Sequence, residues 1–318
     1  MKKIDGEMKF ESTRDGFGKG LLEAAEKNKD VIALSADLTE SVRIHWFRDR
    51  FPERFFSFGV AEQNMMSAAA GFALMGKIPF ACTFGVFAAG RAWDQVRVSV
   101  DYMKLNVKIV GTHAGISVGE DSYTHQALEE ITLMRVLPNM TVIVPCDSIE
   151  SKKATMKAAE RGGPVYLRLG RNASPIVTGE GDPFEIGKGV LMRDGGDVTI
   201  VACGQMLYEA VKAADILEKQ GIDARIINMH TLKPLDDKIL VRAAAETGAI
   251  VTAEEHSRYG GLGSGVSEVI SRNHPVPLEM IGVSECTQSG TPGELFKCYH
   301  LTAEDIAKGA KSALKRKK

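Results

Sequence analysis

No apolar run in the 318-residue sequence approaches the roughly 20 residues that a membrane span needs, and the first residues contain no apolar signal core. Charge of one sign is not in excess: 40 lysines and arginines face 41 aspartates and glutamates, which gives no electrostatic reason to expect nucleic acid. The five cysteines are scattered and never spaced as CxxC, which disfavours structural zinc and favours a reducing compartment. We therefore expect a soluble cytoplasmic protein that binds neither membrane nor nucleic acid.

Short β-branched runs alternate with longer segments of helical periodicity, which is typical of parallel α/β sheets. Several runs are continuously apolar, as in strands that are covered on both faces. Strands are expected at 31–36, 55–60, 78–84, 107–113, 141–145 and 165–170, and in a second series at 198–204, 224–229, 249–255 and 278–283. Residues 172–197, rich in glycine, separate the two series and predict a connection between two α/β domains.

Glu62 is the first candidate for chemistry. It stands where an expected strand gives way to a helix of small residues, in FSFGVAEQNMMSAAAGFALMG. The helix dipole stabilises a carboxylate in the first turn by about 0.3–1 kcal/mol. Because its neighbours are apolar or small, we expect this carboxylate to face a closed pocket. The local pattern leaves open the alternative of a helix N-terminal acid without a chemical role.

A second group of polar residues follows an expected strand, at the edge where open α/β sheets bind ligands. It lies in VGTHAGISVGEDSYTHQALEE (110–130) and contains His113, Glu120, Asp121, His125 and Gln126. The two histidines suit hydrogen bonding to a polar substrate better than zinc, because no third ligand follows at a tight spacing. Either histidine could instead be an ordinary loop residue.

Two arginines stand at the ends of expected elements: Arg14 at a helix start and Arg171 after a strand. A guanidinium beside glycine suits bidentate binding of phosphate or carboxylate, and a surface ion pair is the alternative. The glycine-rich segment 259–265 superficially suggests a dinucleotide loop. Val266 stands where that pattern has glycine or alanine, so a tight turn onto the sheet is the better interpretation.

Taken together, these segments resemble the transketolase family of thiamine-diphosphate enzymes, over essentially the whole chain and in family order. The resemblance is carried by STRDGF (12–17), LSADL (34–38), FGVAEQNM (58–65), CTFGVFAAGRAWDQVR (82–97), GTHAGISVGEDSYTHQALEE (111–130), PVYLRLGR (164–171) and EEHSRYGGLGSGVSE (254–268). It implies two α/β domains with parallel or mixed sheets: a pyrimidine-binding domain at 1–175 and a transketolase C-terminal domain at 194–318, joined by a linker at 176–193.

The resemblance also implies the cofactor site. Glu62 matches the glutamate that hydrogen-bonds the aminopyrimidine ring of thiamine diphosphate and controls the proton transfer that activates the cofactor. Phe84 and Phe87 match aromatic residues that line the pyrimidine pocket, and Asp37 matches an acid near the cofactor. By this resemblance, the segment 82–97 is one residue longer than in many members of the family. The match of Phe87 to its family position is therefore less direct than that of Phe84.

Substrate roles are implied in the same way. Arg14, Ser35, His113 and Arg171 match residues that bind the sugar phosphate, Asp121 matches an aspartate that reads a substrate hydroxyl, and His125 matches a histidine that contacts the donor. His113 and His125 would act with Glu62 as the catalytic residues. The family usually has GEDGP where this chain has Gly119-Glu120-Asp121-Ser122-Tyr123, so the donor pocket is expected to differ in shape.

The GDG motif with which the family binds the diphosphate through Mg²⁺ does not occur here. The resemblance therefore implies one subunit of a split transketolase, in a heterotetramer with two diphosphate-binding (N-terminal) partner subunits that hold most of the Mg²⁺ site. This chain is expected to ligate no metal itself. The implied reaction transfers a two-carbon ketol unit from a ketose phosphate to an aldose phosphate, as in pentose phosphate metabolism.

Two alternatives share part of this pattern. The β subunit of a 2-oxo-acid dehydrogenase and a 1-deoxyxylulose-5-phosphate synthase-like enzyme have the same cofactor glutamate, but His113 and Arg14 favour transketolase. A non-catalytic scaffold is disfavoured, because a scaffold has no physical need for Glu62, Asp121 and His125.

Overall fold

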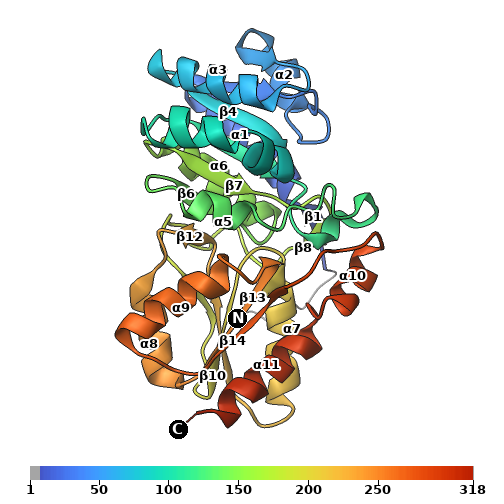
Figure 1. Cartoon of the computed structure of the whole chain (residues 1–318), viewed down its shortest axis with the longest axis vertical. Helices are drawn as coiled ribbons and strands as arrows, with labels where there is room; N and C mark the ends of the chain where they lie inside the picture. Colours follow the sequence, from blue (N-terminus) through green and yellow to red (C-terminus); the bar gives the residue numbers. More distant parts are fainter. Residues whose placement is uncertain (1–7, 318) are drawn as a thin grey trace.

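The computed structural model describes residues 8–317, which form two α/β domains stacked along the long axis of the molecule (Figure 1). The first domain contains a seven-stranded sheet in the order β12-β6-β7-β5-β4-β2-β3. Its strands are β2 (Val31–Ser35), β3 (Phe55–Ser57), β4 (Ile78–Phe84), β5 (Lys108–Thr112), β6 (Thr141–Ile143), β7 (Val165–Arg168) and β12 (Thr231–Lys233). All neighbours are parallel except β12, which runs antiparallel to β6. The first series of predicted strands is thus confirmed.

Helices cover both faces of this sheet, which is why its strands are apolar throughout. Alternate residues of β2 enter two separate cores: Val31 and Ala33 face one, and Ile32 and Leu34 face the other. The first core is closed by α1 (Thr13–Lys27), α2 (His45–Arg50) and α6 (Ser148–Glu160). The second is closed by α3 (Glu62–Leu74), α5 (Glu130–Arg135) and two π-helical turns, η2 (Val86–Arg91) and η3 (Val96–Asp101), on either side of α4 (Trp93–Gln95).

The second domain contains a five-stranded sheet in the order β14-β13-β10-β11-β9. Its strands are β9 (Val190–Arg193), β10 (Val198–Ala202), β11 (Ala224–Asn228), β13 (Ile250–Ser257) and β14 (Leu278–Val283). Only β9 is antiparallel to its neighbour. The helices are α7 (Met206–Glu218), α8 (Asp237–Thr247), α9 (Leu262–Asn273), α10 (Pro292–Cys298) and α11 (Ala303–Lys315). The second series of predicted strands is confirmed as well.

The two domains share a hydrophobic core. Leu240 of α8 and Val266 of α9 belong to the same cluster as Met65 of α3 and Met134 of α5. A continuous core across the boundary holds the domains in a fixed relation, so residues of one domain can form part of a site in the other.

Four short strands lie outside the predicted set. β1 (Phe10–Ser12) and β8 (Ala173–Pro175) form a separate antiparallel ribbon. Strand β9 falls within 176–193, the segment expected to be a linker, yet it extends the sheet of the second domain. Strand β12 follows β11 in the chain but joins the sheet of the first domain, so the chain crosses between the domains more than once. The boundaries 1–175 and 194–318 stay predictions.

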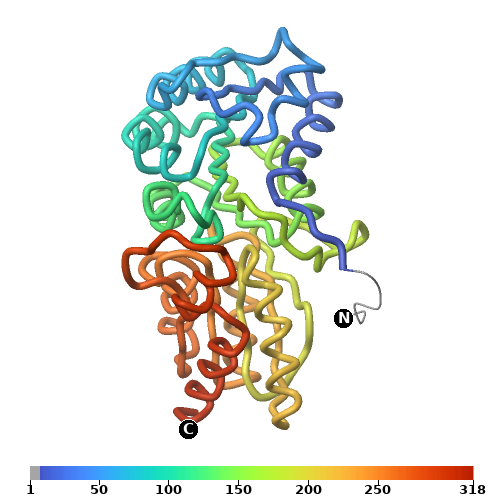
Figure 2. Tube along the Cα trace, turned by 90° about the vertical axis from the view of Figure 1, so that its right-hand side faces the viewer, coloured from blue at the N-terminus to red at the C-terminus, as the bar shows by residue number. Residues whose placement is uncertain are grey.

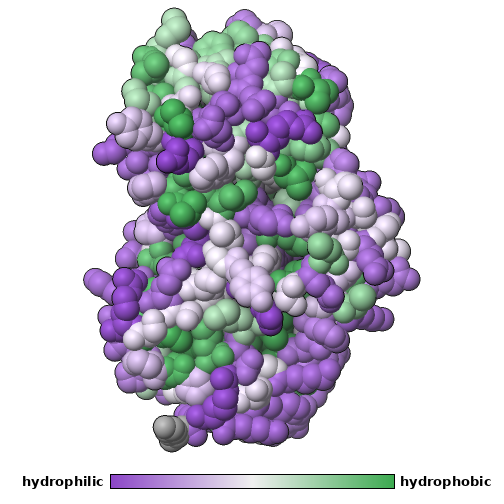
Figure 3. All heavy atoms as spheres, viewed as in Figure 1, coloured by the Kyte–Doolittle hydropathy of each residue, from purple (hydrophilic) through white to green (hydrophobic). Residues whose placement is uncertain are grey.

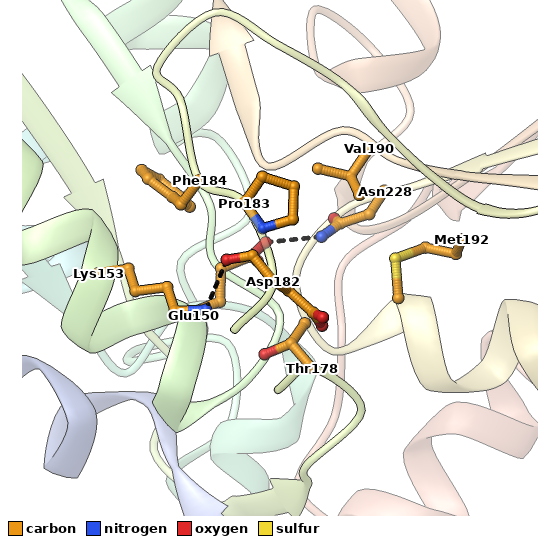
Figure 4. A pocket seen from close by; sticks show the side chains of 9 residues that line it. All are labelled: Glu150, Lys153, Thr178, Asp182, Pro183, Phe184, Val190, Met192 and Asn228. Atoms are coloured by element: carbon orange, nitrogen blue, oxygen red, sulfur yellow. Dashed lines mark hydrogen bonds between the residues drawn. The ribbon is translucent and has the colours of Figure 1, made fainter. Parts of the chain in front are cut away.

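A small cavity lies between α6 of the first domain and β9 and β11 of the second (Figure 4). Its volume is about 10 Å³, which is room for about one water molecule and not for a cofactor. The Glu150 carboxylate accepts hydrogen bonds from the Cys146 backbone N–H and from Asn228 Nδ2, both at 2.7 Å. Burial raises the pKa of Glu150 to about 7, although these two hydrogen bonds act to lower it.

None of the helices in residues 8–317 is long and apolar enough to cross a membrane. The five cysteines, all within these residues, are free thiols, and three of them are buried.

Candidate functional site

Glu62 is the first residue of α3 and is almost fully buried, with 1% of its surface exposed. No side chain caps this helix, so the positive end of the helix dipole acts on the Glu62 carboxylate. One carboxylate oxygen, Oε2, accepts a hydrogen bond from Arg91 Nη1 at 2.8 Å. The other, Oε1, is buried and has no hydrogen-bond partner among the described residues. A buried acceptor without a partner costs about 1–3 kcal/mol, and this oxygen is therefore a candidate to accept a ligand N–H.

Aromatic rings gather where β4 ends. The rings of Phe84 and Phe87 lie 5.9 Å apart at an interplanar angle of 19°, and the His113 ring stacks on Phe84 at 3.8 Å. The His125 ring meets both phenylalanines edge-on, at 6.1 and 5.8 Å. The Arg91 guanidinium lies 4.4 Å from the centre of the Phe87 ring. Two loops and the end of a strand thus place a set of planar groups beside Glu62.

The segment 82–97, expected to be one residue longer than in many members of the family, contains the π-helical turn η2. A π-helix carries more residues per turn than an α-helix, so it absorbs an extra residue without displacing the flanking elements. η2 holds Phe87 near its start and Arg91 at its end. From this position Phe87 stacks with Phe84.

Positive charge surrounds His113, which is buried with 4% of its surface exposed. Burial lowers the pKa of His113 to about 3, and the charges of Arg14 and Arg171 act in the same direction. The ring is therefore neutral at physiological pH, with one nitrogen that donates and one that accepts a hydrogen bond. Its Nδ1 lies 2.9 Å from Thr112 Oγ1, which leaves Nε2 for a ligand.

Arg14 lies in the first turn of α1, which Ser12 caps. Its Nη1 donates to the Ser41 carbonyl at 2.7 Å, while its Nε is buried without a partner among the described residues. Burial first, and then the charge of Arg43, lowers the pKa of Arg14 to about 10. The guanidinium is still charged at neutral pH, and nearby cations that repel one another are stabilised when an anion binds.

Arg171 and Asp121 meet on the loop that follows β5. Arg171 Nη1 donates to the Val118 carbonyl at 2.7 Å and lies 3.4 Å from Asp121 Oδ2. This loop contains the 3₁₀ helix η4 (Ile116–Asp121), and His125 follows it with Nδ1 2.9 Å from Thr124 Oγ1. Asp121 is exposed and His125 is partly exposed, so both side chains are accessible to a ligand.

Ser35 and Asp37 lie at the carboxyl end of β2. Ser35 is fully buried, and its hydroxyl lies 2.9 Å from Thr39 Oγ1. The side chain of Asp37 is exposed, and its backbone has a φ of 63°, in the left-handed region that aspartate tolerates. Ser122 also has a positive φ, and the neighbouring Tyr123 donates its hydroxyl to Glu129 Oε1 at 3.1 Å.

Three residues near the site gain a role only in the folded chain. Arg91 has no signal in the sequence, because a lone arginine on a helix is uninformative until its pairing with Glu62 is seen. Arg43 holds Asp15 Oδ1 at 2.5 Å and adds charge beside Arg14. Gln126 belongs to the polar segment of the sequence, but its role depends on contacts with the second domain. These roles come from tertiary contacts, which no local pattern contains.

Residues 259–261 of the glycine-rich segment form a turn between β13 and α9, as expected, and residues 262–265 already belong to α9. The Glu254 carboxylate accepts the backbone N–H groups of Leu262 and Gly263, at 2.7 and 2.8 Å. The first amides of α9 are therefore already occupied. Among residues 8–317, no group of three or more His, Cys, Asp or Glu side chains could hold a metal ion.

The residues present suit the aminopyrimidine ring of thiamine diphosphate. A planar ring with N–H donors needs an acceptor at its edge and aromatic groups at its faces. Glu62 Oε1 supplies a free acceptor, and Phe84 and Phe87 supply faces. The chain is thus an α/β protein in which a buried carboxylate and stacked rings suit a planar heteroaromatic group, with a group of arginines close by.

The comparison with family models gives the same class. Residues 11–176 match the model described as transketolase, pyrimidine binding domain, and residues 187–306 match the transketolase C-terminal domain. The chain therefore belongs to the transketolase family, a family that implies thiamine diphosphate as cofactor.

Relatives of similar length are named as subunits. The 6-deoxy-6-sulfo-D-fructose transketolase subunit of Clostridium sp. (strain MSTE9) is 44% identical, over 96% of this chain and 95% of its own. An apulose-4-phosphate transketolase subunit of Phocaeicola vulgatus is 39% identical, over 95% of this chain and 97% of its own. A solved structure described as a split gene transketolase, inactive beta4 tetramer, has a TM-score of 0.91 and 49% identity, covering 96% of this chain and 99% of that one.

Proposed function

We propose that this chain is the pyrimidine-binding subunit of a thiamine-diphosphate-dependent split transketolase, which transfers a two-carbon ketol unit from a ketose phosphate to an aldose phosphate. The observation that carries the proposal is the pairing of two neighbouring features. A buried carboxylate with one free oxygen lies beside stacked aromatic rings, and a group of arginines near His113 lies next to the same rings. The first feature suits the cofactor ring, and the second suits a phosphorylated sugar.

Glu62, Phe84 and Phe87 would hold the aminopyrimidine ring, with Asp37 near the cofactor. Once bound, thiamine diphosphate supplies the nucleophilic carbon for ketol transfer. The role of Glu62 is to accept a hydrogen bond from an N–H of the ring. This bond would favour the protonation state of the ring in which the cofactor is activated. Arg91 keeps the Glu62 carboxylate in place through Oε2, so that Oε1 is left for the ligand.

Arg14, Arg171, His113 and Ser35 would bind the sugar phosphate. Because His113 is neutral, the arginines supply the charge and the histidine supplies a directed hydrogen bond. Asp121 would read a substrate hydroxyl, and His125 would contact the donor's oxygens. Two relatives are named for a sulfonated sugar and for a sugar phosphate, and guanidinium groups such as those of Arg14 and Arg171 bind either anion.

A partner would complete the site. We propose that a separate diphosphate-binding subunit supplies the Mg²⁺ and diphosphate contacts, in a heterotetramer in the cytoplasm. Large apolar side chains are exposed around α3 and η3, namely Val60, Leu74, Met75, Val98, Tyr102 and Met103. Figure 3 shows apolar patches on this domain between hydrophilic side chains. Exposed apolar area of this kind is characteristic of subunit contacts.

A donor comparison tests the proposed reaction. The chain is combined with its diphosphate-binding partner, thiamine diphosphate and Mg²⁺, and offered either a ketose phosphate or pyruvate, each with an aldose phosphate as acceptor. The proposal predicts a ketose phosphate product extended by two carbons only from the ketose donor. Product formation from pyruvate alone would instead indicate a 1-deoxyxylulose-5-phosphate synthase-like enzyme. Release of carbon dioxide from a 2-oxo acid without ketol transfer would indicate a 2-oxo-acid dehydrogenase subunit.

A further inference from the structure

The second domain contacts the loop that carries the proposed donor-binding residues. Residues 114–121 connect His113 to Asp121, and the chain then turns through His125. Helix α10 and the segment before it lie beside this loop in both views of the molecule (Figures 1 and 2). Three separate parts of the second domain make polar contacts with this loop: Gln205 before α7, whose Nε2 lies 3.5 Å from Ser117 Oγ, the end of β13, and residues 287–289.

Glu255, near the end of β13, makes the first contact. Its Oε1 accepts the backbone N–H of Ser117 at 2.5 Å, and both residues are buried. Gly115 has a φ of 84°, and a Cβ there would lie well under 3.0 Å from the Glu255 carboxylate. The loop backbone therefore comes so close to Glu255 that a side chain at this position has no room.

Gln126, next to His125, makes the second contact, and it has 1% of its surface exposed. Its Nε2 donates to the Gly119 carbonyl at 3.0 Å within the loop and to the Gln288 carbonyl at 3.2 Å in the second domain. Its Oε1 accepts the hydroxyl of Thr287, which is also buried. The Gln126 side chain thus connects the loop, at Gly119, to the second domain, at residues 287 and 288.

A third contact lies directly beside Asp121. Ser289 Oγ donates to the carbonyl of Glu120 at 2.7 Å. Buried polar groups that are all paired specify a single arrangement, whereas the loss of one partner leaves a costly unpaired group and alternative conformations. The loop therefore owes its shape to groups of the second domain as well as to its own residues.

We propose that the second domain, through Glu255 and Thr287, positions Asp121 and His125 for the donor sugar. Glu255 and Thr287 are then positioning residues, which act through the loop and do not touch the substrate. The inference rests on the proposed function, because that proposal makes Asp121 and His125 the donor-binding residues. A loop that is already ordered binds donor without an ordering cost, so loosening it raises KM for the donor more than it lowers kcat.

The test uses Thr287→Val, which keeps the branched shape and removes only the hydroxyl that bonds to Gln126. In the enzyme reconstituted with its partner subunit, KM for the donor is expected to rise about five-fold, the effect of one ordinary hydrogen bond, with kcat within about two-fold. In this chain alone, amide hydrogen exchange in residues 114–121 is expected to become faster.

Thr199→Val is the matched control. Thr199 is a buried threonine of β10 in the same domain, and its hydroxyl lies 2.9 Å from Thr247 Oγ1 and not at the loop. It is expected to change neither KM for the donor nor the exchange of the loop. Ser289→Ala, at an exposed position, provides a second variant, with a rise in KM of about two-fold.

Unchanged KM and unchanged exchange in Thr287→Val would overturn the inference, and so would equal changes in Thr199→Val. Faster exchange without any change in KM would also overturn it. Thr287 would then order the loop, but the order of the loop would not matter for donor binding. Failure of the proposed function is a different result, in which the wild-type enzyme transfers no ketol unit from any donor.

Discussion

Gly115→Ala is the perturbation that most sharply tests how the two domains meet at the site. The backbone of Gly115 has φ 84° and ψ 178°, a combination that only glycine adopts readily. Holding another residue there costs about 1–3 kcal/mol. The added Cβ would also overlap the buried Glu255 carboxylate, which must then give up the Ser117 N–H. A lost hydrogen bond to a charged group costs about 1.5–3 kcal/mol, so the substitution is expected to lower the free energy of unfolding by about 2.5–6 kcal/mol.

Urea unfolding of the chain, followed by circular dichroism, measures this loss as a fall in the midpoint at constant slope. Gly71→Ala is the control: Gly71 is exposed inside α3, and nothing lies within 4 Å of its added Cβ. This control is expected to stabilise the chain by about 0.5–1 kcal/mol. A loss below about 1 kcal/mol for Gly115→Ala would refute the reasoning, because the Glu255 contact would then tolerate a side chain.

Three further substitutions give independent tests. Arg14→Gln is expected to raise KM for a phosphorylated donor about ten- to hundred-fold in steady-state kinetics, and to leave KM for an unphosphorylated donor nearly unchanged. Arg91→Ala leaves buried Glu62 without its charged partner and is expected to cost about 1–3 kcal/mol in urea unfolding. Glu150, with a pKa of about 7, binds its proton more tightly in the folded than in the unfolded chain. The protonated side chain therefore stabilises the fold fully below about pH 4.5, and this contribution is lost as the pH rises through about 7. Glu150→Gln should therefore remove a decline of about 3 kcal/mol between about pH 4.5 and 7.5 in the unfolding free energy.

The buried parallel strands could be predicted from sequence because their signal is local. β4, for example, is a largely apolar run of seven residues. The strand predicted at 78–84 begins and ends at the same residues in the structure. Strands β9 and β12 could not be predicted, because each is an antiparallel strand at the edge of a sheet, defined by a partner far away in the chain. In β12 the partner belongs to the other domain, and no local pattern carries that information.

The same distinction applies to the candidate site. Glu62, Phe84 and His113 belong to recognisable segments, and the structure brings them together around one group of rings. The partner of Glu62 could not be predicted, because Arg91 reaches it through a π-helical turn. The contact of Glu255 with Ser117 in the loop 114–121 joins residues that are 138 positions apart, so it exists only in the folded chain.

We propose that Glu62 makes this chain one half of a transketolase site. Ketol transfer from xylulose 5-phosphate to ribose 5-phosphate tests this role when it is measured with thiamine diphosphate and Mg²⁺ on this chain, on the partner subunit and on their mixture. Glu62→Gln and Glu53→Gln, an exposed acid of the same domain, are compared in the mixture. We predict activity only in the mixture, reduced at least about 100-fold by Glu62→Gln and unchanged by Glu53→Gln. Full activity of the Glu62→Gln mixture, or activity of this chain alone, would contradict the account.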